Sequence, residues 1–168
     1  IETLNSYFDG YDYESSTHTF LANYIWRNTH DLSWQIIEGY LCIAGLGTLE
    51  TEEKEYFMSF PLTNTGDYDV QKVKATIEAA KEIFREKGQR FELSLVPASL
   101  VPVLKQVFGD SVEVEHTRDD DDYIYMKDDL ISLSGRKLHQ KKNHLNYFLR
   151  NYDFTYQEAT PEMVPEIM

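Results

Sequence analysis

The residues best suited to binding a ligand lie in one stretch, residues 136–150, which contains basic side chains and no acid. Its cations are Arg136, Lys137, Lys141, Lys142 and Arg150. The whole chain has 29 Asp and Glu residues against 16 Lys and Arg residues, a formal net charge of −13. Because bulk composition does not explain a basic stretch in so acidic a chain, it indicates either an anion-binding site or a surface that offsets acidic neighbours.

On a helical wheel this stretch has an apolar stripe and a polar face. Leu138, Leu145 and Leu149 recur at i, i+7 and i+11, so we expect them to be buried and to hold the helix in place. Ser134 and Gly135 come just before, where serine caps free amides and glycine lets an anion approach. The predicted anion- or substrate-binding residues are Arg136, Lys137, Lys141, Lys142, Asn143 and Asn146, with Tyr123 and Tyr125 lining the cleft.

No other set of side chains predicts catalysis, and no metal site is predicted. The run from Asp119 to Asp122 lacks the spaced ligands and the glycine of a calcium loop. Cys42 lies in an apolar run without a second cysteine, so we expect a buried, functionally silent thiol in a reducing compartment. His18 is expected at the surface or near a helix cap, because no second ligand stands at metal spacing.

Length and charge restrict the class of protein. The 168 residues suffice for one domain with a real core. A net charge of −13 argues against a general nucleic-acid binder, because phosphate attraction dominates that affinity. No apolar run approaches the roughly 20 residues needed to cross a bilayer, and no secretory signal is present. We therefore expect a soluble, cytoplasmic protein.

The order of predicted elements gives a mixed central sheet flanked by helices, an α/β or α+β fold. Residues 33–37 and 40–44 form a hairpin that turns at Glu38-Gly39. Gly45 and Gly47 follow the hairpin, and we expect them to loosen the chain there. The further predicted strands cover residues 54–62, 91–95, 112–116, 123–126 and 154–157.

Helical periodicity is strongest over residues 70–87, where Asp69 is the expected cap and Gly88 the expected end. Two further helices are predicted over residues 15–26 and 99–108. Near the end of the chain, Thr160-Pro161-Glu162 has the pattern of a helix start. Because that helix would be cut after about two turns and the chain begins at Ile1, we expect a piece of a longer protein.

Two patches of this sequence resemble a known family. The first, from Ser16 to Trp26, has the pattern S-x-x-T-F-x-x-N-Y-I-W. The second patch runs through Asp122-Tyr123-Ile124-Tyr125, Asp129-Leu130, Leu133-x-Gly135, Lys141-Lys142-Asn143, Asn146 and Phe148. Together they are similar to the soluble relatives of the C-terminal domain of bacterial phosphatidylglycerol lysyltransferase. The family's usual Lys-Arg-Asn is Lys-Lys-Asn here, which keeps the charge and loses a bidentate donor.

The resemblance implies a fold and an activity. Members consist of two tandem lobes like the Gcn5-related N-acetyltransferases, so residues 1–158 would be the first lobe and residues 159–168 the start of the second. The lysyltransferases move an aminoacyl group from a charged tRNA to a lipid head group. The implied partners are the second lobe and an aminoacyl-tRNA or acyl-CoA substrate of the full-length protein. No catalytic residue of the family can be assigned to a position of this sequence.

Cofactor binding by this lobe is not expected. Acetyltransferases hold the pyrophosphate of coenzyme A on bare amides of a glycine-rich loop between a strand and a helix. The corresponding loop here, residues 63–69, lacks the glycine pair and carries acids. Two functions stay open: the first lobe of an acyl- or aminoacyltransferase that supplies a substrate-binding face, or a non-catalytic binding or scaffold domain that docks on a partner or on the second lobe.

Overall fold

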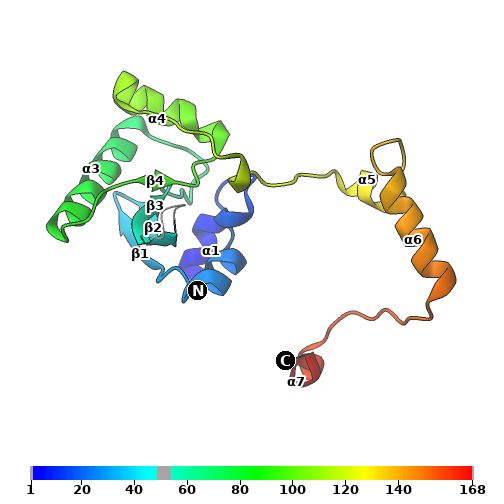
Figure 1. Cartoon of the computed structure of the whole chain (residues 1–168). Coiled ribbons are helices and arrows are strands. Elements are labelled where there is room, and N and C mark those ends of the chain that lie inside the picture. Colours follow the sequence, from blue (N-terminus) through cyan, green and yellow to red (C-terminus); the bar gives the residue numbers. More distant parts are fainter. Residues whose placement is uncertain (1, 49–53, 168) are drawn as a thin grey trace. The chain divides into compact units, whose positions relative to one another are not determined.

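The computed structural model describes residues 2–48 and 54–167 (Figure 1). The chain divides into two compact units, unit 1 (Ile1–Asp122) and unit 2 (Tyr123–Met168). Unit 1 contains a four-stranded sheet in the order β1-β2-β3-β4. The strands are β1 (Ser33–Ile37), β2 (Tyr40–Thr48), β3 (Lys54–Ser59) and β4 (Leu93–Ser94). The first three are antiparallel and β4 is parallel to β3, so the predicted mixed sheet flanked by helices is confirmed.

The β1–β2 hairpin has the predicted register and the predicted turn. Ser33 pairs with Ala44, and Ile37 pairs with Tyr40. The two turn residues have left-handed backbone, with φ 51° at Glu38 and 86° at Gly39. Positive φ at both central positions is what a two-residue hairpin turn of type I′ requires, because its twist matches that of the strands.

The expected loosening at Gly45 is wrong, because β2 continues through it to Thr48. A Cβ atom at Gly45 would lie 2.5 Å from Leu32 Cδ2 and 2.8 Å from the His30 carbonyl oxygen. That carbonyl accepts a hydrogen bond from the Leu46 amide at 2.7 Å. Glycine is therefore present so that the turn before β1 can lie against β2, which extends the sheet and does not end it.

Helix α3 (Val70–Glu86) begins and ends where the sequence predicts, within one residue. Asp69 Oδ1 accepts from the amides of Gln71 and Lys72, both at 2.9 Å. Gly88, with φ 67°, follows the helix. A side chain that satisfies two free amides is the usual reason for an aspartate at this position.

Both faces of the sheet are covered. Cys42 belongs to a buried cluster with Phe84 of α3, and Leu41 belongs to a cluster with Tyr7 of α1 (Glu2–Phe8). Because neighbouring residues of a strand point to opposite faces, β2 contributes to both layers. In Figure 1, α3 and α1 lie on opposite sides of the strands.

The remaining helices of unit 1 differ in detail from their predictions. The predicted helix over residues 15–26 is a 3₁₀ turn (Ser16–His18) followed by α2 (Phe20–Trp26), and the predicted helix over 99–108 is a 3₁₀ turn (Ala98–Leu100) followed by α4 (Val101–Phe108). The predicted strand over residues 112–116 is wrong, because that segment pairs with no described strand. Short 3₁₀ turns lie on either side of it, Gly109–Ser111 and Arg118–Asp120.

Unit 2 consists of α5 (Lys127–Ser132), α6 (His139–Asn151), a 3₁₀ turn (Pro161–Met163) and α7 (Val164–Ile167). The predicted strands over residues 123–126 and 154–157 are wrong; both segments lack strand partners among the described residues. None of residues 123–165 is buried. Over the ranges 2–48 and 54–167, no helix combines the length and the apolar character that crossing a membrane requires.

Candidate anion-binding site

The loop between α5 and α6, residues 133–138, sets the geometry of the basic stretch. Leu133 has φ 45° and Gly135 has φ 82°, so the backbone is left-handed at both. The Leu133 amide donates to the Asp129 carbonyl at 2.9 Å, which ends α5. This tight loop brings its own side chains beside the first turn of α6.

The basic helix begins later than the sequence predicts. Its first residue is His139, and Arg136 and Lys137 lie in the turn before it. Ser134 does not cap α6, because no side chain caps this helix; the Ser134 hydroxyl accepts a hydrogen bond from Ser132 Oγ at 3.2 Å. The predicted serine cap is therefore wrong, and the first amides of α6 are left to other partners.

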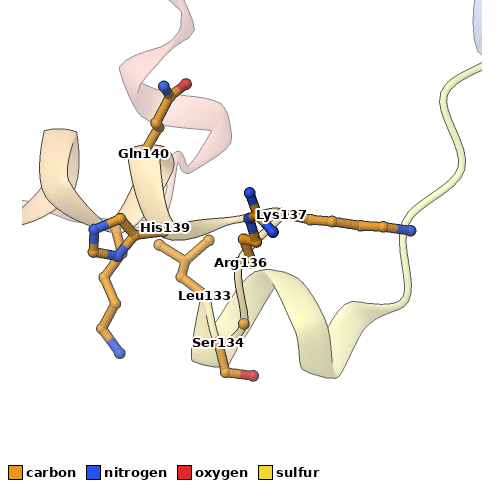
Figure 2. A pocket seen from close by; sticks show the side chains of 8 residues that line it. Leu133, Ser134, Arg136, Lys137, His139 and Gln140 are labelled. Carbon is orange, nitrogen blue, oxygen red and sulfur yellow. The ribbon is translucent and has the colours of Figure 1, made fainter.

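The loop and the first turn of α6 line a hollow of about 610 Å³ (Figure 2). Its charged lining side chains are Arg136, Lys137 and Lys142, and none of its lining residues is an acid. The other lining residues are Leu133, Ser134, Gly135, His139 and Gln140. Cations beside the N-terminus of a helix favour an anionic ligand, because both attract negative charge.

The cations of the hollow are open to a ligand. Lys142 Nζ donates to the Ser132 carbonyl at 3.5 Å, at the end of α5. Within the described ranges, Arg136, Lys137 and Lys142 have no carboxylate oxygen within 4.0 Å. Three neighbouring positive charges that have no carboxylate partner among the described residues can pair with an external phosphate or carboxylate.

Lys141 does not line the hollow. Neighbouring residues of a helix point about 100° apart, so Lys141 and Lys142 face different directions. Asn143 also lies outside the lining, but its Nδ2 is 3.3 Å from Nε2 of His139, which does line it. Asn146 is half-buried and further along α6. Ligand binding by Lys141, Asn143 and Asn146 stays a prediction.

Tyr123 and Tyr125 lie in the segment before α5 and do not line the hollow either. Tyr123 is 89% exposed and Tyr125 is 53% exposed. The structure of unit 2 therefore gathers three of the eight predicted binding residues, Arg136, Lys137 and Lys142, in one hollow. A role of the two tyrosines in lining a cleft stays a prediction.

The predicted burial of the apolar stripe on α6 is wrong. Leu145 is 45% exposed and Leu149 is 51% exposed, because unit 2 supplies no second apolar layer against them. Phe148 instead packs locally, with its ring 5.2 Å from that of Tyr152 and 5.1 Å from that of Phe154. The neighbouring lysines consequently stay hydrated, which weakens and screens their contacts with an anion.

Ser134 and Gly135 were predicted only as the entrance to the helix, and three further lining residues, Leu133, His139 and Gln140, are missing from the predicted binding residues. Gln140 would have been included had the helix start been placed at His139, because it then falls in the first turn. Leu133 has no sequence signal, since a bulky residue rarely adopts left-handed backbone and nothing nearby predicts that it does here.

The comparisons with known proteins bear on the whole chain. The family described as "Phosphatidylglycerol lysyltransferase, C-terminal" matches residues 8–168. The chain belongs to this family. No curated protein matches it.

A crystal structure from Bacteroides thetaiotaomicron VPI-5482, titled as a conserved protein of unknown function, shares the fold of this family member, with a TM-score of 0.80 and 23% sequence identity. The match covers 99% of this chain and 53% of that one. The chain therefore spans about half the length of the solved structure.

The two patches that carry the family resemblance meet at a hydrogen-bonded pair, Ser16 and Asp122. Within the first patch, Thr19 Oγ1 caps α2 by accepting from the Ala22 amide at 3.2 Å. Asn23 Nδ2 donates to the Thr19 carbonyl at 2.8 Å. In this member of the lysyltransferase family, these polar positions thus shape the entry to α2 and its attachment to the end of unit 1.

His18 is buried, so its expected surface position is wrong. It is 4% exposed and stacks on Tyr13, with ring centroids 5.2 Å apart. Its Nδ1 lies 3.2 Å from Thr17 Oγ1, and its Nε2 has no partner among the described residues. Burial lowers the pKa of His18 to about 4, and the charge of Asp122 opposes that shift.

The acidic run from Asp119 to Asp122 does not act as a group. Asp121 Oδ1 lies 2.8 Å from Nε2 of the exposed His116, whereas Asp122 binds Ser16. No cluster of three or more His, Cys, Asp or Glu side chains in the described part of the chain has a metal-binding arrangement. The carboxylates of Asp121 and Asp122 thus have separate partners.

Proposed function

We propose that this chain is the first lobe of a two-lobe acyl- or aminoacyltransferase-like protein and supplies a face that binds the anionic part of the substrate. The observation that carries the proposal is the hollow lined by Arg136, Lys137 and Lys142, in a chain of net charge −13. Membership of the phosphatidylglycerol lysyltransferase family supports the proposed reaction class, transfer of an aminoacyl group from a charged tRNA to a lipid head group.

Every substrate of that class carries phosphate. The tRNA backbone, the pyrophosphate of coenzyme A and the head group of phosphatidylglycerol each present oxygen atoms that accept charge-assisted hydrogen bonds. A hollow of about 610 Å³ is large enough for a phosphate group together with part of its sugar or glycerol. The face contributes position and charge, which lowers the entropic barrier to transfer but does not complete catalysis.

A second lobe of the same protein is the proposed partner. Among residues 123–165 no side chain is buried, although many are apolar, and the matched crystal structure is about twice as long as this chain. Covering α6 with a second lobe, in a tandem like that of the Gcn5-related N-acetyltransferases, would bury Leu145 and Leu149. Water would then be removed from beside Lys142, which strengthens its contact with an anion.

We propose that this lobe binds no coenzyme A at the N-terminus of α3. In acetyltransferases the amides at that position hold a pyrophosphate. Here the amides of Gln71 and Lys72 are occupied by the carboxylate of Asp69, at 2.9 Å each. A phosphate would have to displace a carboxylate that is tied to the same backbone. The acyl donor is therefore expected to bind on the second lobe.

The test uses the complete two-lobe protein and a matched pair of substitutions. Lys142→Ala removes a charge from the hollow, and Lys141→Ala removes the same charge from the next residue outside it. With folding verified by circular dichroism, we measure the affinity for lysyl-tRNA and the transfer of lysine to phosphatidylglycerol vesicles. Combining Arg136→Ala with Lys142→Ala should weaken tRNA binding at least tenfold, about 1.4 kcal/mol.

Lys141→Ala alone should change that affinity less than twofold. If Lys141→Ala and Lys142→Ala weakened tRNA binding equally, only the overall charge would matter. Unchanged affinity in the double variant would contradict the proposal that the hollow binds the substrate. The isolated 168-residue chain should transfer no aminoacyl or acyl group. Turnover by it would show that the second lobe is not required.

The exposed apolar face of α6 supports one alternative, a non-catalytic domain that docks on a partner. In that case the complete protein would bind its partner without transferring an aminoacyl or acyl group, and Leu145→Asp would disrupt docking while the Lys142→Ala variant would not. We place the protein in the cytoplasm, because a charged tRNA or acyl-CoA is the expected donor and Cys42 is an unpaired thiol.

A further inference from the structure

A second hollow, of about 380 Å³, lies wholly within unit 1. Its walls come from the segment 16–32, from β2 and β3, and from residues 92–95. It shares no lining residue with the basic hollow of unit 2. Its volume is at the small end of the range for ligand sites, which limits an occupant to a small molecule.

One wall of this hollow is aromatic. The rings of Trp26 and His30 are 5.7 Å apart, and those of His30 and Phe57 are 6.5 Å apart. Trp26, which lines the hollow, is 52% exposed, so its ring is accessible to a ligand. His30 Nδ1 lies 3.0 Å from the Leu46 carbonyl, so this nitrogen donates to that oxygen and fixes the orientation of the ring.

The charged side chains of the hollow are all acidic. Glu55, Glu92 and Asp120 line it, and none of its lining residues is Lys or Arg. Glu55 and Glu92 are half-buried, yet within residues 2–48 and 54–167 neither has a cation within 4.0 Å. Glu92 Oε1 accepts a hydrogen bond from Ser94 Oγ at 3.4 Å. Both carboxylates can still form charge-assisted hydrogen bonds with a positively charged ligand.

We propose that this hollow binds a small organic cation, an ammonium or guanidinium group joined to an apolar or aromatic body. The charged group lies against the carboxylates of Glu55 and Glu92. The body packs on Trp26, whose ring face attracts the adjacent positive charge. An anion of the same size is repelled by the carboxylates, so this hollow and the basic hollow of unit 2 select ligands of opposite charge.

The first experiment tests which ligand charge the hollow prefers, with three probes of nearly equal shape. Benzylamine, benzyl alcohol and benzoate are titrated into the 168-residue chain carrying Trp34→Phe. The chain has two tryptophans, so the fluorescence of Trp26 then reports occupancy, and calorimetry gives the affinity independently. Benzylamine should bind saturably at millimolar concentration or below and should change the Trp26 signal. Its affinity should exceed that of benzyl alcohol at least tenfold, and benzoate should not bind.

The second experiment assigns the carboxylates. Glu55→Gln and Glu92→Gln keep the shape of the side chain and remove its charge, and each should weaken benzylamine binding at least fivefold. Glu86→Gln, on the exposed side of α3, makes the same charge change away from the hollow and should leave the affinity within twofold. Lys142→Ala should have no effect, which keeps this proposal separate from the function proposed for the basic hollow.

Several outcomes would overturn the proposal. Equal affinity for benzylamine and benzyl alcohol would make the hollow merely apolar. If Glu86→Gln and Glu92→Gln weakened benzylamine binding equally, the net charge of the chain and not a local site would explain the binding. Saturable binding by calorimetry without a change in Trp26 fluorescence would place the cation elsewhere, and absence of saturable benzylamine binding at millimolar concentration would remove the site.

Discussion

Asp122 binds Ser16 with both of its carboxylate oxygens. Oδ2 accepts from the Ser16 amide at 2.8 Å and Oδ1 accepts from Ser16 Oγ at 2.6 Å. The side-chain hydrogen bond and then the backbone hydrogen bond lower the pKa of Asp122. Because Asp122 is the last residue of unit 1, this pair fixes the point at which the chain leaves that unit.

Asp122→Asn should loosen the segment that ends unit 1. The amide group turns one acceptor into a donor, so it cannot accept both hydrogen bonds from Ser16, and we expect a loss of about 1 kcal/mol in the free energy of unfolding. Hydrogen exchange of residues 117–122 should accelerate. Asp121→Asn is the matched control, because Asp121 pairs with the exposed side chain of His116 and not with Ser16. Equal acceleration in both variants would contradict a specific role of Asp122.

Stability should decrease in mild acid because of His18. Its pKa falls from 6.5 to about 4, chiefly through burial. His18 therefore becomes protonated below pH 6.5 in the unfolded chain, but only below about pH 4 in the folded chain. The free energy of unfolding is therefore highest above pH 6.5. It falls as the pH decreases across this window, by up to about 3 kcal/mol. Urea unfolding at several pH values measures it.

His18→Phe keeps an aromatic ring against Tyr13 and removes the titrating group, so the slope of stability against pH in this window should flatten. A slope that persists in His18→Phe would show that other groups cause the acid sensitivity.

Cys42 should be almost unreactive in the folded protein. It is 5% exposed, and burial raises the pKa of its thiol to about 12, so neither access nor the thiolate is available. Labelling by an aromatic disulfide reagent should follow the rate of unfolding. Cys42→Ala should cost about 1–2 kcal/mol, a small cavity penalty. Rapid labelling without denaturant would be incompatible with this position in the core.

Two glycines of β2 should differ in their tolerance of alanine. At Gly45 a Cβ would lie 2.8 Å from a backbone oxygen, whereas at Gly47 the nearest atom is a ring carbon at 3.5 Å. We expect Gly45→Ala to lower the free energy of unfolding by about 1–3 kcal/mol and Gly47→Ala to change it by less than about 0.5 kcal/mol. Thermal and urea unfolding of the two variants provide the comparison. Similar costs would mean that the sheet moves to accommodate both.

The elements that could be predicted from the sequence are those whose signals are local. Glu38-Gly39 specifies its own turn geometry, and Asp69 supplies the cap of α3 from its own side chain. The segment 123–126 has the composition of a strand, but a strand exists only where an unpaired edge receives it. No local pattern shows whether such an edge is present, so this assignment failed.

The candidate site was predictable in charge but not in arrangement. The acid-free run identified Arg136, Lys137 and Lys142, because net charge is a property of composition. The difference between Lys141 and Lys142 depends on where α6 begins, and no local sequence signal places that start at His139. The acidic hollow of unit 1 was missed entirely, since its carboxylates come from three distant segments.

Unit 1 contains all of the buried side chains in the described chain, the last in sequence being Leu104. Cooperative melting and the accompanying rise in heat capacity come from exposing such side chains to water. A calorimetric transition of this polypeptide will therefore report unit 1. Helices α5 and α6, too short for independent stability, will melt gradually over a broad range of temperature. A second lobe that covers Leu145 and Leu149 would be recognised by the appearance of a second cooperative transition.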